Sequence, residues 1–185
     1  MKSRLLVALL SASLLAALQA RAKTILPDAC GDDSVKFDVS TQKGQPPPAP
    51  PADGKAQIVF IETLDGCFGC GTPTSRFGMD GAWVGANKGS SYFTMDIAPG
   101  EHHLCTDWQS VFGKLKQKVG LTSFTAEAGK VYYYEAKVTM IAHQYGFGPN
   151  SSREVDKDLV FGQLSDDEGK YRVKASAVAA SKPSK

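Results

Sequence analysis

The sequence predicts a mostly β protein, an antiparallel β-sandwich of about seven strands with at most one short helix. Three observations predict it: short runs of alternating apolar and polar residues recur along the chain, glycine-containing turn signals separate them, and helical periodicity is scarce. The 185 residues are 42% hydrophobic and 22% charged. This composition suits one globular core rather than a disordered chain or a multi-span membrane protein.

Residues 1–22 have the pattern of a secretory signal peptide. Two basic residues precede an apolar run over residues 5–18, and residues 20–22 offer small side chains at positions −3 and −1 of a cleavage site. The run of 14 residues is shorter than the roughly 20 that span a bilayer as a helix. We therefore expect an exported protein, periplasmic or extracellular, that begins at Lys23 and keeps no stable membrane span. An uncleaved N-terminal anchor is the alternative.

Residues 23–53 are predicted to form an N-terminal segment with one strand and a proline-rich connector. Val35, Phe37 and Val39 alternate with polar residues, as in a half-buried strand. Five of the ten prolines follow within residues 45–51, where an extended polyproline conformation is favoured. We interpret this run as a stiff connector, and a ligand for a proline-recognising partner is the alternative.

Residues 54–174 are predicted to hold the strands of the sandwich. Residues 58–61 form a short apolar run, which is consistent with a strand buried on both faces. The other predicted strands alternate between apolar and polar residues and cover residues 92–97, 124–126, 132–140 and 171–174. Glycine turns such as Pro99-Gly100 separate them, because glycine accepts the positive φ that such turns require.

Helical signals are few. Val111, Leu115 and Val119 recur at four-residue spacing and predict at most a short helix or helical turn over residues 110–119. Residues 175–185 are small, polar and basic, and they are predicted to be a flexible tail.

Four cysteines in a chain bound for an oxidising compartment indicate disulfide bonds. We predict the pairs Cys67–Cys70 and Cys30–Cys105. Gly69 allows the short ring of the first pair to close, and the second pair would attach the N-terminal segment to the sandwich. Two other pairings stay open, in which Cys67 and Cys70 each pair with one of the outer cysteines.

Cys67 and Cys70 also form a CxxC motif, which provides an alternative function, that of a periplasmic thiol-disulfide oxidoreductase. In a thioredoxin-like protein the first cysteine of such a pair lies at a helix N-terminus, which lowers its pKa. Here Gly71 and Pro73 follow, and these residues do not build a helix. A structural disulfide is therefore the preferred interpretation.

His102, His103 and Cys105 could join the CxxC cysteines in a zinc site. The two histidines are adjacent in a predicted strand, so their side chains point to opposite faces, and an oxidising compartment favours disulfides over zinc thiolates. The sequence contains neither a nucleophile elbow nor a phosphate-binding loop. We therefore expect no cofactor, no metal and no catalytic residue.

The charge of the chain does not indicate nucleic acid binding. Without the three basic residues of the leader, 18 basic side chains face 19 acidic ones, so the mature surface is close to neutral. Exposed aromatic side chains can stack on sugars or anchor a protein partner. Trp108 and Tyr145 lie outside the clean alternation and are the candidate binding surface for an envelope protein or a glycan.

The chain also contains a series of ordered segments: GKAQIVF (54–60), RFGMDGAWVG (76–85), SYF (91–93), PGEHHLC (99–105) and AEAGKVYY (126–133). In this order they resemble the bacterial family called domain of unknown function 2846. The resemblance implies an exported β-sandwich module with no established activity and no catalytic residues. The CxxC is not part of the pattern. Together these observations predict a non-catalytic exported module of the cell envelope with a structural or binding role.

Overall fold

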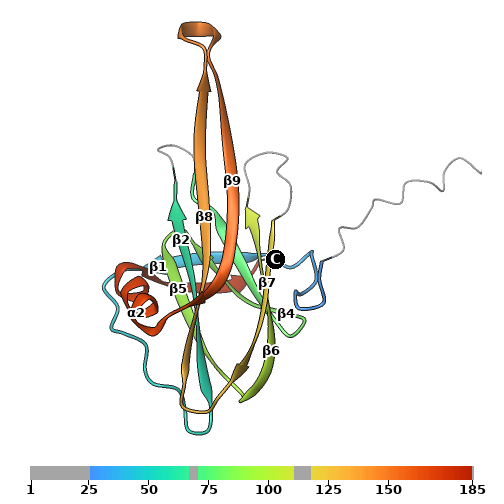
Figure 1. Cartoon of the computed structure of the whole chain (residues 1–185), viewed down its shortest axis with the longest axis vertical. Helices are drawn as coiled ribbons and strands as arrows, with labels where there is room; N and C mark the ends of the chain where they lie inside the picture. Colours follow the sequence, from blue (N-terminus) through green and yellow to red (C-terminus); the bar gives the residue numbers. More distant parts are fainter. Residues whose placement is uncertain (1–25, 67–70, 111–117, 185) are drawn as a thin grey trace, which may run out of the picture.

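Two β-sheets packed face to face form the protein. The computed structural model describes residues 26–66, 71–110 and 118–184. The sheets have six and four strands, and the described residues contain one α-helix (Figure 1). The predicted class, a mostly β sandwich, is confirmed, although the described residues form ten strands where about seven were predicted.

The six-stranded sheet has the order β1-β10-β5-β2-β8-β9. The pairs β2–β8 and β10–β5 are parallel, whereas the other neighbours are antiparallel. In sheet order the strands are β1 (Phe37–Gln42), β10 (Ala177–Pro183), β5 (Ser91–Ile97), β2 (Ala56–Asp65), β8 (Val131–Tyr145) and β9 (Ser152–Leu164).

The four-stranded sheet, of order β4-β3-β6-β7, is antiparallel throughout. Phe60 of the first sheet and Phe77 and Leu104 of the second are fully buried between the two sheets. The ring centres of Phe60 and Phe77 are 5.0 Å apart. Alternate residues of each strand thus build one core. The strands of this sheet are β4 (Ala82–Lys88), β3 (Thr74–Met79), β6 (Gly100–Ser110) and β7 (Val119–Ala126).

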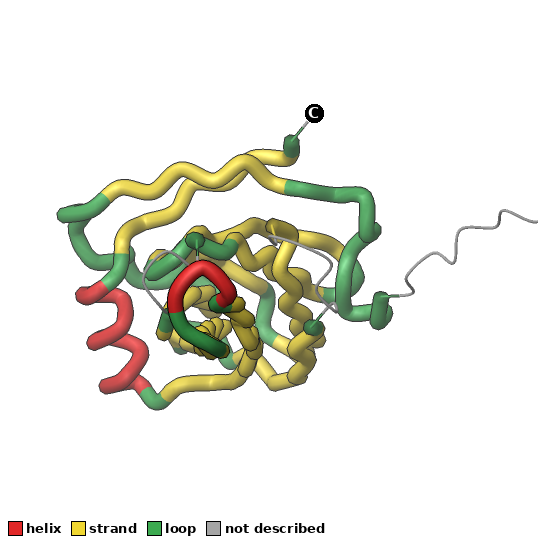
Figure 2. The backbone as a smooth tube through the Cα atoms, turned by 90° about the horizontal axis from the view of Figure 1, so that it is seen from above, coloured by secondary structure: helices red, strands yellow, loops and turns green. Residues whose placement is uncertain are grey.

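Contacts between the sheets cover both open sides of the sandwich. On one side β9 packs against β7, where Lys118 Nζ lies 2.9 Å from Asp158 Oδ1. On the other side β1 and β10 form an outer layer across β4 (Figure 2). There the Ala86 amide donates a hydrogen bond to Ser181 Oγ at 3.1 Å.

Residues 171–174 belong to a helix, so the strand predicted there is wrong. Helix α2 (Asp166–Ala175) begins after Ser165, whose Oγ accepts a hydrogen bond from the Glu168 amide. Ser165 and Glu168 have the S-x-x-E spacing of a capping box. Acidic side chains fill the first turn and basic ones the last, which complements the helix dipole. These terminal signals outweigh an alternation of only four residues.

Strand β10 corrects the prediction that residues 175–185 are a flexible tail. Ala177–Pro183 pairs with β1 along the whole length of that strand. Small, polar residues form this strand because the backbone, rather than the side chains, supplies the hydrogen bonds of the pairing. The predicted segment 23–53 thereby contributes β1 to the six-stranded sheet. The helix predicted over residues 110–119 falls largely outside the described residues, and its two end residues belong to β6 and β7.

Strands β8 and β9 form a long hairpin that extends beyond the rest of the sandwich (Figure 1). A short 3₁₀ turn, Gly148–Asn150, lies at its tip. The strand β9 had no counterpart among the predicted strands. The hairpin carries Tyr145, one of the two predicted surface aromatics, away from the body of the protein.

Candidate functional site

The face of the six-stranded sheet that points away from the four-stranded sheet is also apolar. Val59 and Ile61 of β2, Tyr92 of β5 and Tyr133 of β8 form a second buried cluster there. The apolar run at residues 58–61 predicted a strand buried on both faces, and β2 is buried on both faces over this stretch. Two segments that are far apart in the sequence cover this outer face.

Helix α2 covers one side of the outer face. Its buried residue is Gly169, where an added Cβ would lie only 2.1 Å from the Tyr133 ring, so the absence of a side chain allows this close approach. Arg172 Nε lies 3.1 Å from Glu135 Oε1, and Thr63 Oγ1 donates a hydrogen bond to the same oxygen at 2.8 Å. The Gly169 contact and the Arg172–Glu135 ion pair hold α2 on β8, and Thr63 of β2 orients the Glu135 carboxylate.

The proline-rich residues cover the other side. Residues 44–51, termed the proline strap, lead from β1 toward the start of β2 and run beside α2 (Figure 1). Gln57 Nε2 donates a hydrogen bond to the Ala49 carbonyl at 3.0 Å, and the Ala52 amide donates one to Asp96 Oδ2 at 3.2 Å. Since proline has no N–H, the strap presents mainly rings and carbonyl groups. The predicted connector therefore also covers part of the outer face of the six-stranded sheet.

Between α2, the proline strap and the outer face lies a groove of about 870 Å³. Such a volume is typical of small-molecule sites. Lys170 and Lys174 line its α2 side, and none of its lining residues is Asp, Glu, His or Cys. Its apolar lining comes from the strap and from Val59, Tyr92, Val131, Tyr133, Val173 and Val178.

Sequence reasoning missed this groove. Two of its signals were visible, namely the proline run and the strand that is apolar on both faces. Neither signal reveals that α2 and the proline strap lie on the same face of one sheet. The two lysines gave no signal, because their spacing along α2 could be read only after the helix was known.

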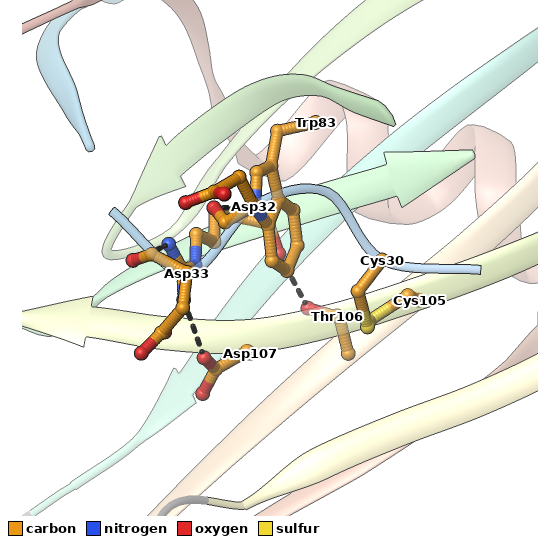
Figure 3. The surroundings of a disulfide bond; sticks show 8 residues. Cys30, Asp32, Asp33, Trp83, Cys105, Thr106 and Asp107 are labelled. Carbon is orange, nitrogen blue, oxygen red and sulfur yellow. Dashed lines mark hydrogen bonds and ion pairs between the residues drawn. A yellow bond between two sulfur atoms is a disulfide. The ribbon is translucent and has the colours of Figure 1, made fainter. Parts of the chain in front are cut away.

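A disulfide joins Cys30 to Cys105, which confirms this predicted pair. It attaches the residues before β1 to the four-stranded sheet (Figure 3). The Cys30 and Cys105 side chains are 5% and 0% exposed, so the bond lies beneath the surface. The predicted pair Cys67–Cys70 lies outside the described residues, and the oxidoreductase alternative stays a prediction.

Arg76 of β3 holds the same segment through polar contacts. Its Nη1 donates to the Asp33 carbonyl at 3.1 Å, and its Nη2 lies 3.0 Å from Asp107 Oδ2. The guanidinium carbon lies 4.2 Å from the centre of the Trp83 ring, a cation–π distance. Figure 3 shows Asp33, Trp83 and Asp107 gathered near the disulfide. The arrangement is a structural anchor for the N-terminal segment.

Trp108 is only 5% exposed, so its prediction as a surface residue is wrong. It packs against Val138 and Met140 in the interior. Residues 104–108 are all buried, because the N-terminal segment covers the opposite face of β6. Tyr145 is 55% exposed near the end of the hairpin, and its ring stacks on His143 with centres 6.4 Å apart. A binding role for Tyr145 stays a prediction.

Cys105 and His102, two of the residues considered for zinc, have other partners in the structure, whereas Cys67 and Cys70 lie outside the described residues. Cys105 is bonded to Cys30, and the described residues contain no group of three or more side chains arranged for a metal. His102 Nδ1 lies 2.6 Å from Asp80 Oδ2, and its Nε2 lies 2.8 Å from the Ala98 carbonyl. Burial lowers the pKa of His102, but the two hydrogen bonds raise it by more than burial lowers it. The net effect is a pKa above the ordinary value of 6.5. The pair fastens the β3–β4 turn to β6.

We expect the Asp80–His102 pair to make a small contribution to the free energy of unfolding, which is largest in mildly acidic solution. The pKa of Asp80 is lowered despite some burial, since His102 and the His103 amide stabilise its carboxylate. The Asp80 contribution is therefore lost as pH falls below about 3.8, and that of His102 is lost as pH rises above about 6.5. Asp80→Asn, which tolerates the positive φ of 52°, should destabilise the protein by no more than about 1 kcal/mol at pH 5.5.

Urea unfolding at pH 5.5 and pH 9 measures this effect. The difference between Asp80→Asn and the unsubstituted protein should shrink at pH 9, where His102 is neutral. Asp53→Asn is the control, because Asp53 is exposed and forms no ion pair within the described residues. An equal loss of stability for Asp80→Asn at both pH values would contradict the assignment.

A buried carboxyl lies in the interior near the end of β2. Glu62 is fully buried, and the Ser75 amide donates a hydrogen bond to its Oε2 at 2.7 Å. Burial raises the pKa of Glu62 from 4.5 to about 8, because the interior solvates a carboxylate poorly. Three nearby polar atoms, Glu62 Oε1, Ser75 Oγ and Asn87 Oδ1, have no hydrogen-bond partner within the described residues. Glu62 is therefore mostly protonated at neutral pH.

Comparisons of the chain with protein-family models, with curated proteins and with solved structures found no match. Within the described ranges, no helix has the length and apolar character needed to cross a membrane. The groove and the charges along its edge therefore carry the functional argument.

Proposed function

We propose that the protein is a non-catalytic binding module, exported to the cell envelope, and that it binds an apolar ligand in the groove between α2 and the proline strap. The groove is the observation that carries this proposal. Its volume of about 870 Å³ and its valine, proline and tyrosine lining are those of a site for a small apolar molecule. The contacts that fix α2 and the proline strap on the sheet form the groove before any ligand binds.

The side chains around the groove support a binding role over a catalytic one. Acid–base and nucleophilic mechanisms need a group that accepts a proton near neutral pH. The lining residues include no carboxylate, imidazole or thiol, and their only amines, those of Lys170 and Lys174, belong to exposed residues. Burial raises the pKa of Tyr92 and of Tyr133 above 10, so both phenols stay protonated. The lining thus supplies shape and apolar area rather than a reactive pair.

The predicted signal peptide and the Cys30–Cys105 bond support export. Disulfides persist in oxidising compartments such as the periplasm, and this one is buried. The sequence predicted an envelope protein or a glycan as the partner. The lining of the groove favours neither of these. Sugar recognition requires many hydrogen-bonding groups, whereas this lining is mostly aliphatic.

Binding of N-phenyl-1-naphthylamine, a neutral apolar dye whose fluorescence rises in apolar sites, tests the proposal. Mature protein beginning at Lys23 should show saturable binding. Val173→Trp, which fills the groove from α2, should weaken it at least tenfold. Val160→Trp is the matched control, because Val160 lies on β9, is 59% exposed and does not line the groove.

Circular dichroism and urea unfolding check that each variant is folded. If Val173→Trp disturbs α2, Val131→Phe narrows the groove from the sheet side instead. The proposal is wrong if the unsubstituted protein does not bind the dye saturably. It is equally wrong if folded groove variants bind the dye as tightly as Val160→Trp.

A further inference from the structure

We infer that the ligand is a single-chain amphiphile with an anionic head group, held by Lys170 and Lys174 at the α2 edge of the groove. This inference rests on the proposed function and names the class of ligand. The two lysines lie one helical turn apart on α2, and both line the groove. Side chains four residues apart on a helix lie on the same face, so both ammonium groups can approach one anion.

The charges around these lysines leave them available. Lys174 forms no ion pair within the described part of the chain, while Lys170 Nζ lies 3.6 Å from Asp166 Oδ2. That pair is exposed, at 64% and 73%, and exposed pairs are weak and readily exchanged. Arg172, by contrast, is engaged with Glu135 and Glu168. The groove side of α2 is therefore cationic, with no carboxylate among the lining residues.

The shape and lining of the groove indicate the rest of the ligand. Four valines and four prolines supply aliphatic surface on three sides, which suits a flexible acyl or alkyl chain through the hydrophobic effect. Lysine is a compact point charge and does not select a planar anion as arginine does. A carboxylate and a phosphate monoester thus share the chemistry that this edge recognises, and the experiment has to separate them.

A structural role for the lysines makes a different prediction. A cation in the last turn of a helix, as Lys174 is in α2, stabilises the helix through its dipole, and Lys170 forms an i,i+4 pair with Asp166. If this were their whole role, replacing them would lower the stability of α2 and change the binding of all head groups alike. Head-group preference is therefore the readout that distinguishes ligand binding from helix stabilisation.

Displacement of N-phenyl-1-naphthylamine by four ligands with the same twelve-carbon chain tests the inference. Dodecanoate and dodecyl phosphate are anionic, dodecyl maltoside is neutral and dodecyltrimethylammonium is cationic, each used below its micelle concentration at pH 8 and low salt. The anionic ligands should displace the dye at concentrations at least tenfold lower than the maltoside. The ratio between the two anions shows which head group is preferred.

The double variant Lys170→Gln/Lys174→Gln should reduce this preference to less than about twofold while keeping maltoside binding. Lys88→Gln/Lys182→Gln is the control, because it removes the same charge at exposed positions outside the groove, and its preference should be unchanged. Equal displacement by anionic and neutral ligands, or a preference that survives in the first variant, overturns the inference. The proposed function still stands in both cases, since it depends on dye binding and its loss in Val173→Trp.

Discussion

Replacing both members of the Cys30–Cys105 pair by serine is expected to lower the free energy of unfolding by about 4 kcal/mol. The two cysteines are 75 residues apart, and a cross-link over so long a loop strongly restricts the unfolded chain. For a chain of this size, the same change corresponds to a fall of about 10 °C in the midpoint of thermal unfolding.

The double variant is the appropriate test of this bond. A single substitution would leave one free thiol able to exchange with Cys67 or Cys70. Urea and thermal unfolding of the mature protein give the stability, and limited proteolysis at Lys36 reports whether the N-terminal segment stays docked. We expect it to stay docked at low temperature, because Arg76 and Gln109 still bind it. Unchanged midpoints for the double variant would contradict the assigned role of the disulfide.

Glu62→Gln is expected to remove most of the alkaline loss of stability of this protein. The pKa of Glu62 rises from 4.5 in the unfolded chain to about 8 in the folded one. Between these values the folded protein holds a proton that the unfolded chain has released, so the free energy of unfolding falls as pH rises. At 1.36 kcal/mol per pKa unit, the full fall is about 5 kcal/mol, complete just above pH 8.

Urea unfolding from pH 5 to pH 9 measures this slope. The Gln variant has the same shape as protonated glutamic acid and can still accept the hydrogen bond from the Ser75 amide. Its stability relative to the unsubstituted protein should therefore rise with pH by up to about 5 kcal/mol. Glu101→Gln serves as the control, since the Glu101 side chain is 70% exposed and should leave the slope unchanged. Parallel pH profiles for the unsubstituted protein and Glu62→Gln would show that the carboxyl is not buried as described.

Local pattern predicted the parts of the fold in which side chains alternate over many residues. The runs at residues 92–97 and 132–140 are strands β5 and β8, because a two-residue period places one apolar face on a core. The same reasoning failed at residues 171–174, where four alternating residues were too few to outweigh the capping signals of α2. It also failed at residues 175–185, because small residues give no pattern and pairing with β1 depends on a distant strand.

The sequence by itself determined that this protein is a mostly β sandwich, that Cys30 could pair with Cys105, and that residues 45–51 form a connector outside helices and strands. Each of these follows from local period, from cysteine chemistry or from the fixed φ of proline. Only the tertiary structure decided that Trp108 is buried, because Val138 and Met140 of β8 in the other sheet pack against it, and local alternation cannot show which distant strand covers a face. Only the tertiary structure formed the groove, since its walls and floor come from residues 44–51, 57–59, 92, 129–133 and 170–178. Contacts over such separations depend on how sheets and helices pack, which no local period records.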